Sequence, residues 1–308
     1  MLNGKSEMTV EKEIKQQVRE FYDQVGWQEV SEGVYQNARY EDLRPVSREY
    51  IHKCHLRVSR HLAPNGRFLL DAGSGPIQYP EYLDYSRGYH ARVCIDISAV
   101  ALEEARQRIG DIQSGGKGLF VVADIANLPF CRESFDGVVS LHTIHHLPHE
   151  EHQFAYHELF RVLAPDRFAV VVNGWDSAPL MRILNPAIRW ANRFRWYIGR
   201  NGAVEDDQVP KKEINAKPRN KPKGTYIMKN TPGRFKSEIG DDIPMKILVW
   251  RSVSVRFLRA LVHPRLCGRW GLGLLFWLEE RFPYFFGENG QYPLIVLCKT
   301  RSAGEGWE

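Results

Sequence analysis

The chain of 308 residues lacks the long apolar run that a membrane span needs. Its longest charge-free apolar stretch, Trp270 to Leu278, is far shorter than the ~20 residues of a transmembrane helix. The stretch from Met1 to Lys15 carries charges of both signs and has no apolar signal-peptide region, so no secretory signal is predicted. We therefore expect a cytoplasmic protein. Its 43% hydrophobic and 26% charged residues are typical of a packed globular protein of enzyme size.

The chain is also poor in cysteine, with five in all and no C-x-x-C pair. Their odd number and wide spacing argue against a disulfide framework and against a structural zinc site. We expect reduced and mostly buried thiols at Cys54, Cys94, Cys131, Cys267 and Cys298.

Acidic residues are scarce in one segment. Residues 176–236 hold 14 Lys and Arg against 5 Asp and Glu, a charge of +9 within a chain whose net charge is +5. Such a segment is compatible with a solvated surface, an acidic substrate, a nucleic acid or an anionic membrane.

Hydrophobic periodicity organises the rest of the chain. A spacing of i, i+4, i+7 and i+11 from Ile14 to Val25 predicts an N-terminal amphipathic helix, and a second helical stretch covers Ser47 to Leu62. Short apolar strands then alternate with helical patterns, which indicates a parallel sheet covered on both faces. The predicted strands are Phe68 to Asp71, Arg92 to Asp96, Leu119 to Asp124, Gly137 to Leu141 and Phe168 to Asn173.

The alternation ends after Trp175. Leu180 to Arg200 has helical periodicity with an expected break at Asn185-Pro186, and the polar stretch Asn201 to Gly224 predicts a mobile loop. The remaining predicted elements are a helix at Pro232 to Ile239, a strand at Met245 to Val255, helices at Val255 to Val262 and Arg269 to Phe282, and a strand at Tyr292 to Lys299.

A glycine turn is the sharpest chemical feature. The apolar strand that ends at Asp71 runs directly into Gly73-Ser74-Gly75, where two glycines allow a ligand to approach the backbone closely. Asp96 ends the next strand 21 residues beyond Gly75, at the position of a ribose-binding carboxylate. The turn lacks the third glycine of the dinucleotide-binding pattern, so an NAD enzyme fits less well.

Further motifs follow in order: Ile95-Asp96-Ile97-Ser98, Ala123-Asp124 with Leu128-Pro129-Phe130, Phe135-Asp136-Gly137-Val138-Val139 and His145-His146-Leu147-Pro148. Together with Leu70-Asp71-Ala72-Gly73-Ser74-Gly75, this series resembles the class I S-adenosylmethionine-dependent methyltransferases. The small-molecule branch of the ubiquinone and menaquinone C-methyltransferases is the most similar. The resemblance covers about residues 67–173 and departs from the pattern at Asp166-Arg167, where a glycine is usual.

The resemblance implies a doubly wound α/β fold, Rossmann-like, with a seven-stranded sheet. It divides the chain into an N-terminal helical cap (1–65), a cofactor-binding core (66–175), a basic insertion between strands five and six that would act as a lid (176–240), and C-terminal elements (241–308). The last two strands would form an antiparallel edge hairpin.

The cofactor would be S-adenosyl-L-methionine. By the same resemblance, Gly73 and Gly75 would approach its methionine part, Asp71 would position its amino group directly or through water, and Asp96 would hold the ribose. Asp124 would face the adenine amino group, between apolar walls that Ile97 and Ile125 would form.

Six of the eleven histidines lie between positions 142 and 157. Pro148 separates His145 from His149, and no cysteine or paired carboxylate completes a ligand set, so we expect no metal site. His145 and His146 match a loop of the family and would support it. His142 replaces a usually small or polar residue near the methyl group, which makes it a candidate general base or a residue that lines the pocket.

Two surfaces remain open to more than one interpretation. Arg182, Arg189, Arg193 and Arg200 share one face of the basic helix, with apolar residues from Ile183 to Ile198 opposite. This face would be solvated, recognise an acidic substrate, or contact an anionic membrane. The apolar region from Trp270 to Phe286 would pack as core beside the last strands or line an apolar pocket.

The expected activity is methyl transfer to an oxygen, carbon or nitrogen nucleophile of a small molecule. An RNA methyltransferase is the first alternative, because of the basic segment, although the chain lacks the Asn/Asp-Pro-Pro-aromatic tetrad and a recognised RNA-binding module. The second is a non-catalytic accessory protein that binds the cofactor or a membrane. The oligomeric state stays open.

Overall fold

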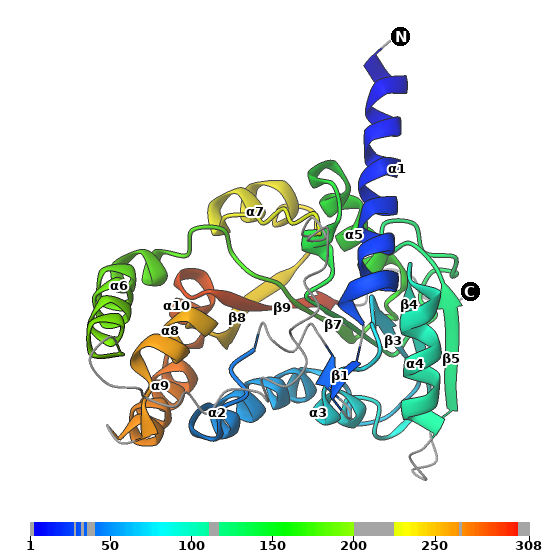
Figure 1. The fold of residues 1–308 in the computed structure, drawn as a ribbon. Helices are drawn as coiled ribbons and strands as arrows, with labels where there is room; N and C mark the ends of the chain where they lie inside the picture. The colour runs from blue at the N-terminus through cyan, green and yellow to red at the C-terminus, as the bar shows by residue number, and fades with distance from the viewer. Residues whose placement is uncertain are drawn as a thin grey trace.

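The computed structural model describes residues 3–27, 29–31, 34–35, 41–110, 117–199, 225–264 and 267–300. The predicted mobile loop, 201–224, therefore lies outside the described residues. Figure 1 shows a central twisted sheet with α2 and α3 on one side and α5 and α7 on the other. The predicted α/β fold with a seven-stranded sheet is confirmed.

The sheet has the strand order β5-β4-β3-β6-β7-β9-β8. The first five strands in this order pair in parallel, whereas β9 runs antiparallel to both β7 and β8. The strands are β3 (Gly66–Ala72), β4 (Tyr89–Asp96), β5 (Lys117–Val122), β6 (Gly137–Leu141), β7 (Arg167–Val172), β8 (Met245–Arg251) and β9 (Tyr292–Lys299). A separate two-stranded sheet pairs β1 (Glu29–Ser31) with β2 (Val34–Tyr35).

The helices match the predicted periodicity at most positions. The N-terminal helix continues into a π-helical turn at Tyr22–Gly26. The α-helices are α1 (Asn3–Phe21), α2 (Pro45–Leu56), α3 (Pro80–Asp84), α4 (Ala99–Gly110), α5 (His149–Val162), α6 (Pro179–Gly199), α7 (Pro232–Ile239), α8 (Val255–Leu261), α9 (Gly268–Arg281) and α10 (Pro283–Asn289).

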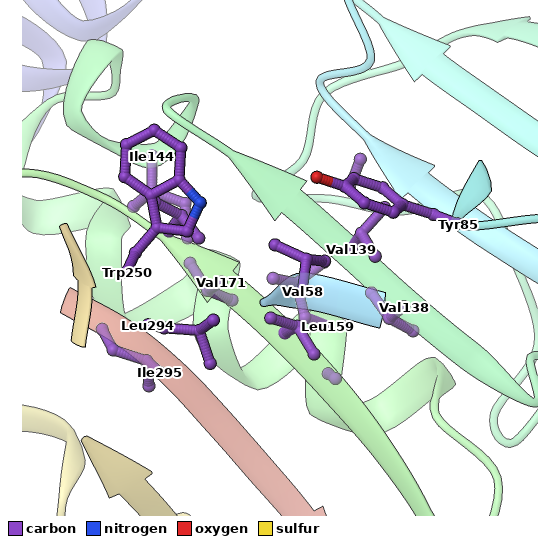
Figure 2. Close-up of a cluster of buried hydrophobic side chains, with 14 of the residues drawn as sticks. Val58, Tyr85, Val138, Val139, Ile144, Leu159, Val171, Trp250, Leu294 and Ile295 are labelled. Atoms are coloured by element: carbon purple, nitrogen blue, oxygen red, sulfur yellow. The ribbon is translucent and has the colours of Figure 1, made fainter. Parts of the chain in front are cut away.

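The core lies between the sheet and its covering helices. Figure 2 shows Val138 and Val139 of β6 next to Val171 of β7 and Leu294 and Ile295 of β9. All five side chains are fully buried, with an exposed fraction of 0%. These residues come from adjacent strands of the sheet. Both faces of the strands are therefore buried, as their near-continuous apolar sequences predicted.

The break expected at Asn185-Pro186 is wrong, because α6 is continuous with Pro186 inside it. A proline there removes one backbone donor and favours a kink without ending the helix, when packing holds both halves. Met181 and Ile188 on either side of Pro186 are both buried.

The C-terminal apolar region was expected to be buried, and this is wrong for most of it. Leu272 and Phe286 are buried, but Trp270 is 83% exposed, and Leu274, Trp277, Phe282, Tyr284 and Phe285 are also exposed. Along the sequence, the helices α8, α9 and α10 lie between β8 and β9. The two edge strands therefore pair antiparallel but are not joined by a tight hairpin turn.

Two smaller expectations change as well. All five thiols are free, but Cys131 and Cys267 are exposed, so the expectation of mostly buried cysteines is wrong. Asp166, where the family usually has glycine, adopts a φ of +58°. Asp tolerates this left-handed conformation better than most residues, which lets the turn form without glycine.

Candidate functional site

A cavity of about 910 Å³ opens at the carboxyl ends of the parallel strands, which is within the size range of ligand sites. This edge is where open α/β sheets bind ligands. The cavity brings together all the candidate site residues: Asp71, Gly73, Gly75, Asp96, Ile97, Asp124, Ile125 and His142.

The glycine turn forms one wall of the cavity. Gly73 and Gly75 have φ values of +73° and +54°, which other residues adopt only with strain. A Cβ at position 73 would lie 2.2 Å from Thr143 Cγ2, and one at position 75 would lie 3.0 Å from Trp27 Cζ2. Both positions therefore require glycine for conformation and for space.

Asp96 stands at the end of β4 beside this turn. Its Oδ2 accepts a hydrogen bond from Gly75 N at 3.0 Å, and its Oδ1 accepts one from Ser98 N at 2.9 Å. Burial raises the pKa of Asp96 to about 6. The two hydrogen bonds oppose this shift, because they stabilise the charged carboxylate and lower the pKa. Each carboxylate oxygen has a second lone pair, so both can still accept a ligand hydroxyl.

Asp71, at the end of β3, forms a buried ion pair with Arg92 of β4. Arg92 donates to Asp71 Oδ2 through Nε at 3.1 Å and also through its NH2 group. Among the described residues, Oδ1 forms no hydrogen bond. Oδ1 therefore keeps lone pairs for a further hydrogen-bond donor.

Asp124 is held from above by the N-terminal helix. Lys15 Nζ of α1 lies 2.5 Å from Asp124 Oδ2 and 2.6 Å from Glu151 Oε1 of α5. Asp124 Oδ1 accepts a hydrogen bond from Ala126 N at 2.9 Å, which fixes the loop after β5. This bridge anchors α1 across the end of the cavity that Ile97 and Ile125 also line.

His142 extends from the end of β6 with a φ of +57°, a strained conformation for a non-glycine residue. Its backbone N donates to Val172 O at 2.7 Å, and its ring lies 5.0 Å from the Trp250 ring and 5.7 Å from the Tyr292 ring. Burial, followed by the charge of Arg251, lowers the pKa of His142 to about 3. The imidazole is therefore neutral at physiological pH.

The neighbouring histidines hold the loop together. Tyr22 OH donates to His146 Nε2 at 2.7 Å, while His146 Nδ1 donates to the carbonyl of Tyr226 at 2.8 Å. Met228 N donates to the carbonyl of His145 at 2.8 Å. This loop thus joins the N-terminal cap to the segment that precedes α7. Within the described residues, no group of three or more His, Cys, Asp and Glu side chains is arranged to hold a metal ion.

Sequence reasoning missed the residues that close the cavity from both ends of the chain. Tyr22 and Trp27 stack at 5.0 Å over the glycine turn. Lys229, Arg251 and Tyr292 line the opposite wall. None of these belongs to a local motif. The predicted N-terminal helix contains Tyr22, and the predicted strands Met245 to Val255 and Tyr292 to Lys299 contain Arg251 and Tyr292, but these patterns gave no sign of a role in the cavity.

Comparisons with known proteins agree with this geometry. Residues 70–171 match the methyltransferase domain family. Over 129 residues, the chain is 31% identical to probable tRNA methyltransferase 9B of Mus musculus. That match covers 41% of this chain and 26% of the relative, so the chain spans about a quarter of that protein's length.

Two solved structures share the fold. Geranyl diphosphate C-methyltransferase from Streptomyces coelicolor A3(2) aligns with a TM-score of 0.51 and 13% identity, over 93% of this chain and 98% of that one. Phosphoethanolamine N-methyltransferase 2 from Haemonchus contortus aligns with a TM-score of 0.51 and 14% identity, over 92% of this chain and 60% of that one. No helix in the described part of the chain has the length and apolarity to cross a membrane.

Proposed function

We propose that this chain, whose residues 70–171 form a class I S-adenosylmethionine-dependent methyltransferase domain, transfers a methyl group to an oxygen, carbon or nitrogen atom of a small molecule. The supporting observation is that eight residues selected from the sequence line one cavity at the carboxyl edge of the sheet. We place the chain in the small-molecule branch that resembles the ubiquinone and menaquinone C-methyltransferases.

The residues of the cavity fit S-adenosylmethionine. Gly73 and Gly75 leave room for its methionine part, and Asp71 Oδ1 is available to its ammonium group. Asp96 accepts hydrogen bonds from two backbone N–H groups and not from a cationic side chain. Its carboxylate would therefore be available to the ribose hydroxyls. Asp124 with Ile97 and Ile125 would contact the adenine.

When bound, S-adenosylmethionine supplies an electrophilic methyl group, and the protein has to align a nucleophile with it and exclude water. Tyr22 and Trp27 cover the cofactor end, whereas the segment 225–230 covers the other end. We propose that residues 1–65 act as a cap, 66–175 bind the cofactor, 176–240 form a lid and 241–308 complete the sheet.

His142 is placed to act on the methyl acceptor. A neutral imidazole accepts a hydrogen bond from a hydroxyl or acid and takes up its proton as methyl transfer proceeds. The Trp250 and Tyr292 rings hold the imidazole from two sides. We therefore propose His142 as the candidate general base, with lining of the acceptor pocket as the alternative role.

Calorimetry tests the cofactor. We expect the protein to bind S-adenosylmethionine and S-adenosylhomocysteine and to ignore NADH. Small-molecule fractions of a cell extract, added with S-adenosylmethionine, should cause S-adenosylhomocysteine to accumulate. Tight NADH binding without a response to S-adenosylhomocysteine would overturn the proposal.

RNA methylation is the second candidate function. It is favoured by the similarity to a probable tRNA methyltransferase and by the charge of +9 in residues 176–236. A gel shift with bulk tRNA, measured at low and high salt, tests it, because phosphate contacts weaken steeply with salt. Methyl incorporation into tRNA would replace the small-molecule proposal.

We also propose peripheral contact with an anionic membrane through α6 and α9. The α6 sequence holds Arg182, Arg189, Arg193 and Arg195 and no acidic residue. Its Ile183, Trp190 and Phe194 side chains are more than half exposed, as are Trp270, Leu274 and Trp277 of α9. Exposed aromatic and basic side chains together are typical of helices that lie in a membrane interface.

A further inference from the structure

Acidic and basic side chains are unevenly distributed along the cavity. Asp71, Asp96 and Asp124 lie at the ends of β3 and β4 and after β5, where we place the cofactor. The other end is lined by cationic side chains from α6, the segment before α7, β8 and α8. They are Arg182, Lys229, Arg251, Arg256 and Arg259.

Glu41 is the acidic residue of the cavity that faces this basic end, and it pairs with Arg251. Arg259 donates a hydrogen bond to the backbone carbonyl of Glu41 at 2.8 Å, which leaves the carboxylate to Arg251. Arg182 and Arg256 form no ion pair with the described residues. Within the described residues, the basic end therefore has more cationic groups than carboxylates that pair with them.

Lys229 is a partly buried cation of this end, whereas Arg251 is almost fully buried. Its Nζ packs against the backbone after β7, where a Cβ on Gly174 would lie 3.2 Å away. Burial lowers the pKa of Lys229, and the charge of Asp176 counters this only in part. Lys229 forms no salt bridge within the part of the chain that the structure describes, and Asp176 acts on it only through its charge.

Lys229 also lies among the histidines of the proposed methyl-transfer site. Its charge contributes to the lowered pKa values of His142, His145 and His146. Beyond it, Arg251 stacks at 4.6 Å on the Tyr292 ring and has a buried Nε with no hydrogen-bond partner. The partly buried Lys229 and the buried Arg251 thus retain unused donors near His142.

We propose that Lys229 and Arg251, with Arg182 and Arg256 at the rim, bind an anionic group of the methyl acceptor, either a carboxylate or a phosphate. This inference rests on the proposed function for the position of the acceptor. Lys229, Arg182 and Arg256 form no salt bridge with the described residues. Such cations attract an anion more strongly in a partly dehydrated cavity than on an open surface. Charge-assisted hydrogen bonds would also satisfy the free donors.

An anion at this place would have a second effect. It would offset the charges of Arg251 and Lys229, which lower the pKa of His142. The pKa of His142 should therefore rise when the anion binds, so that the acceptor itself strengthens the base beside it. This coupling gives a readout that is independent of turnover.

The experiment uses the full chain saturated with S-adenosylhomocysteine. Methyl phosphate, propionate and neutral propionamide are each titrated and followed by calorimetry and by the ¹³Cε1 resonance of His142. Lys229→Met is the test variant and Lys229→Arg retains the charge. Lys236→Met is the matched control, because Lys236 pairs with Glu288 on the surface outside the cavity.

We expect methyl phosphate or propionate to bind the wild type and Lys236→Met, to raise the pKa of His142, and to bind Lys229→Met at least tenfold more weakly. Lys229→Arg should recover most of the binding, and propionamide should not bind. The proposal is overturned if Lys229→Met binds both anions like the wild type, or if propionamide binds as well as they do.

The affinity for S-adenosylhomocysteine separates the two proposals. It should be unchanged in all three variants, since Lys229 and Lys236 lie outside the cofactor contacts. Absence of S-adenosylhomocysteine binding in the wild type contradicts the proposed function. Intact S-adenosylhomocysteine binding without anion binding contradicts only the anion subsite.

Discussion

Asp96 is a residue at which binding and stability oppose each other. Because burial raises its pKa to about 6, the folded protein binds a proton more tightly than the unfolded chain does. The free energy of unfolding should therefore decrease as pH rises from about 4 to about 6, and the loss should persist above that range. A shift of this size corresponds to at most about 3 kcal/mol.

Asp96→Asn should remove this loss and weaken the cofactor site. Asn has one acceptor oxygen and cannot accept both backbone hydrogen bonds that Asp96 accepts. The variant should therefore unfold at a lower temperature than the wild type near pH 4, and this difference should shrink towards pH 8. Its affinity for S-adenosylhomocysteine should fall by roughly 1.5 to 3 kcal/mol, because a charge-assisted hydrogen bond to the ribose is lost. Scanning calorimetry of unfolding and titration calorimetry of S-adenosylhomocysteine binding check these two expectations. Asp84→Asn, at a surface ion pair, is the control. Unchanged affinity would remove Asp96 from the site.

His142 can be tested without disturbing its backbone. Asn tolerates the left-handed conformation at position 142, so His142→Asn should fold and bind S-adenosylhomocysteine normally. Its turnover should fall by roughly 10² to 10⁴, the usual contribution of a general base. With a pKa of about 3, His142 should leave kcat/KM of the wild type unaffected between about pH 5 and pH 7. A decrease with a midpoint near pH 6.5 that His142→Asn abolishes would contradict this environment.

At the scale of elements, Glu279 joins three segments that lie far apart in the sequence. It lies on α9 and is 0% exposed. It accepts hydrogen bonds from Tyr50 of α2 at 2.7 Å, from Arg57 at 2.9 Å and from the backbone of Ser252, just after β8, at 2.9 Å. These contacts hold α9 and α2 against the β8 edge of the sheet.

Glu279→Gln should lower the free energy of unfolding by roughly 3 kcal/mol or more, because Arg57 is then left buried without its inner carboxylate. Glu280→Gln, which removes the more exposed partner of Arg57 and Arg60, should cost less than about 1 kcal/mol. Urea unfolding of the two variants provides the measurement. Equal losses would show that Glu279 is not the residue that fixes α9.

The predictability of the elements follows from how local their signals are. Buried parallel strands such as Gly137–Leu141 were found from continuous apolar residues, because both faces of such a strand need them. The continuous α6 was not found, because Pro186 signals a break locally while Met181 and Ile188 hold the helix by distant packing. The apolar side chains of α9 were expected to be buried and are mostly exposed. Hydrophobicity alone does not reveal which face of a helix meets the core.

At the scale of the whole molecule, the site combines a predictable half with an unpredictable one. The glycine turn and the acidic strand ends could be predicted, because each belongs to a short sequence motif and all of them lie at the carboxyl edge of the parallel strands. Lys15 and Trp27 reach the cavity from the N-terminal segment, and Lys229 reaches it from a segment more than 200 positions further along the chain. Their convergence depends on long-range packing, which no spacing in the sequence encodes.

The exposed aromatic side chains of α6 and α9 are likewise a property of the whole molecule. Figure 1 shows both helices on the same side, away from β5. Trp190 and Phe194 of α6 stack at 5.5 Å, while Trp270 and Trp277 of α9 are 83% and 59% exposed. Aromatic rings partition into the membrane interface, and basic side chains add attraction to anionic lipids.

The wild type should therefore sediment with vesicles of equal parts phosphatidylglycerol and phosphatidylcholine, and much less with phosphatidylcholine alone. Replacing Trp270 and Trp277 together by Ala should release a large share of the protein from the anionic vesicles. Phe154→Ala, at a residue of α5 that is 61% exposed, should release none, because it lies on a different helix. If the wild type stays in the supernatant while ultracentrifugation shows a dimer that the double variant abolishes, the surface binds a second copy of the chain and the membrane proposal is wrong.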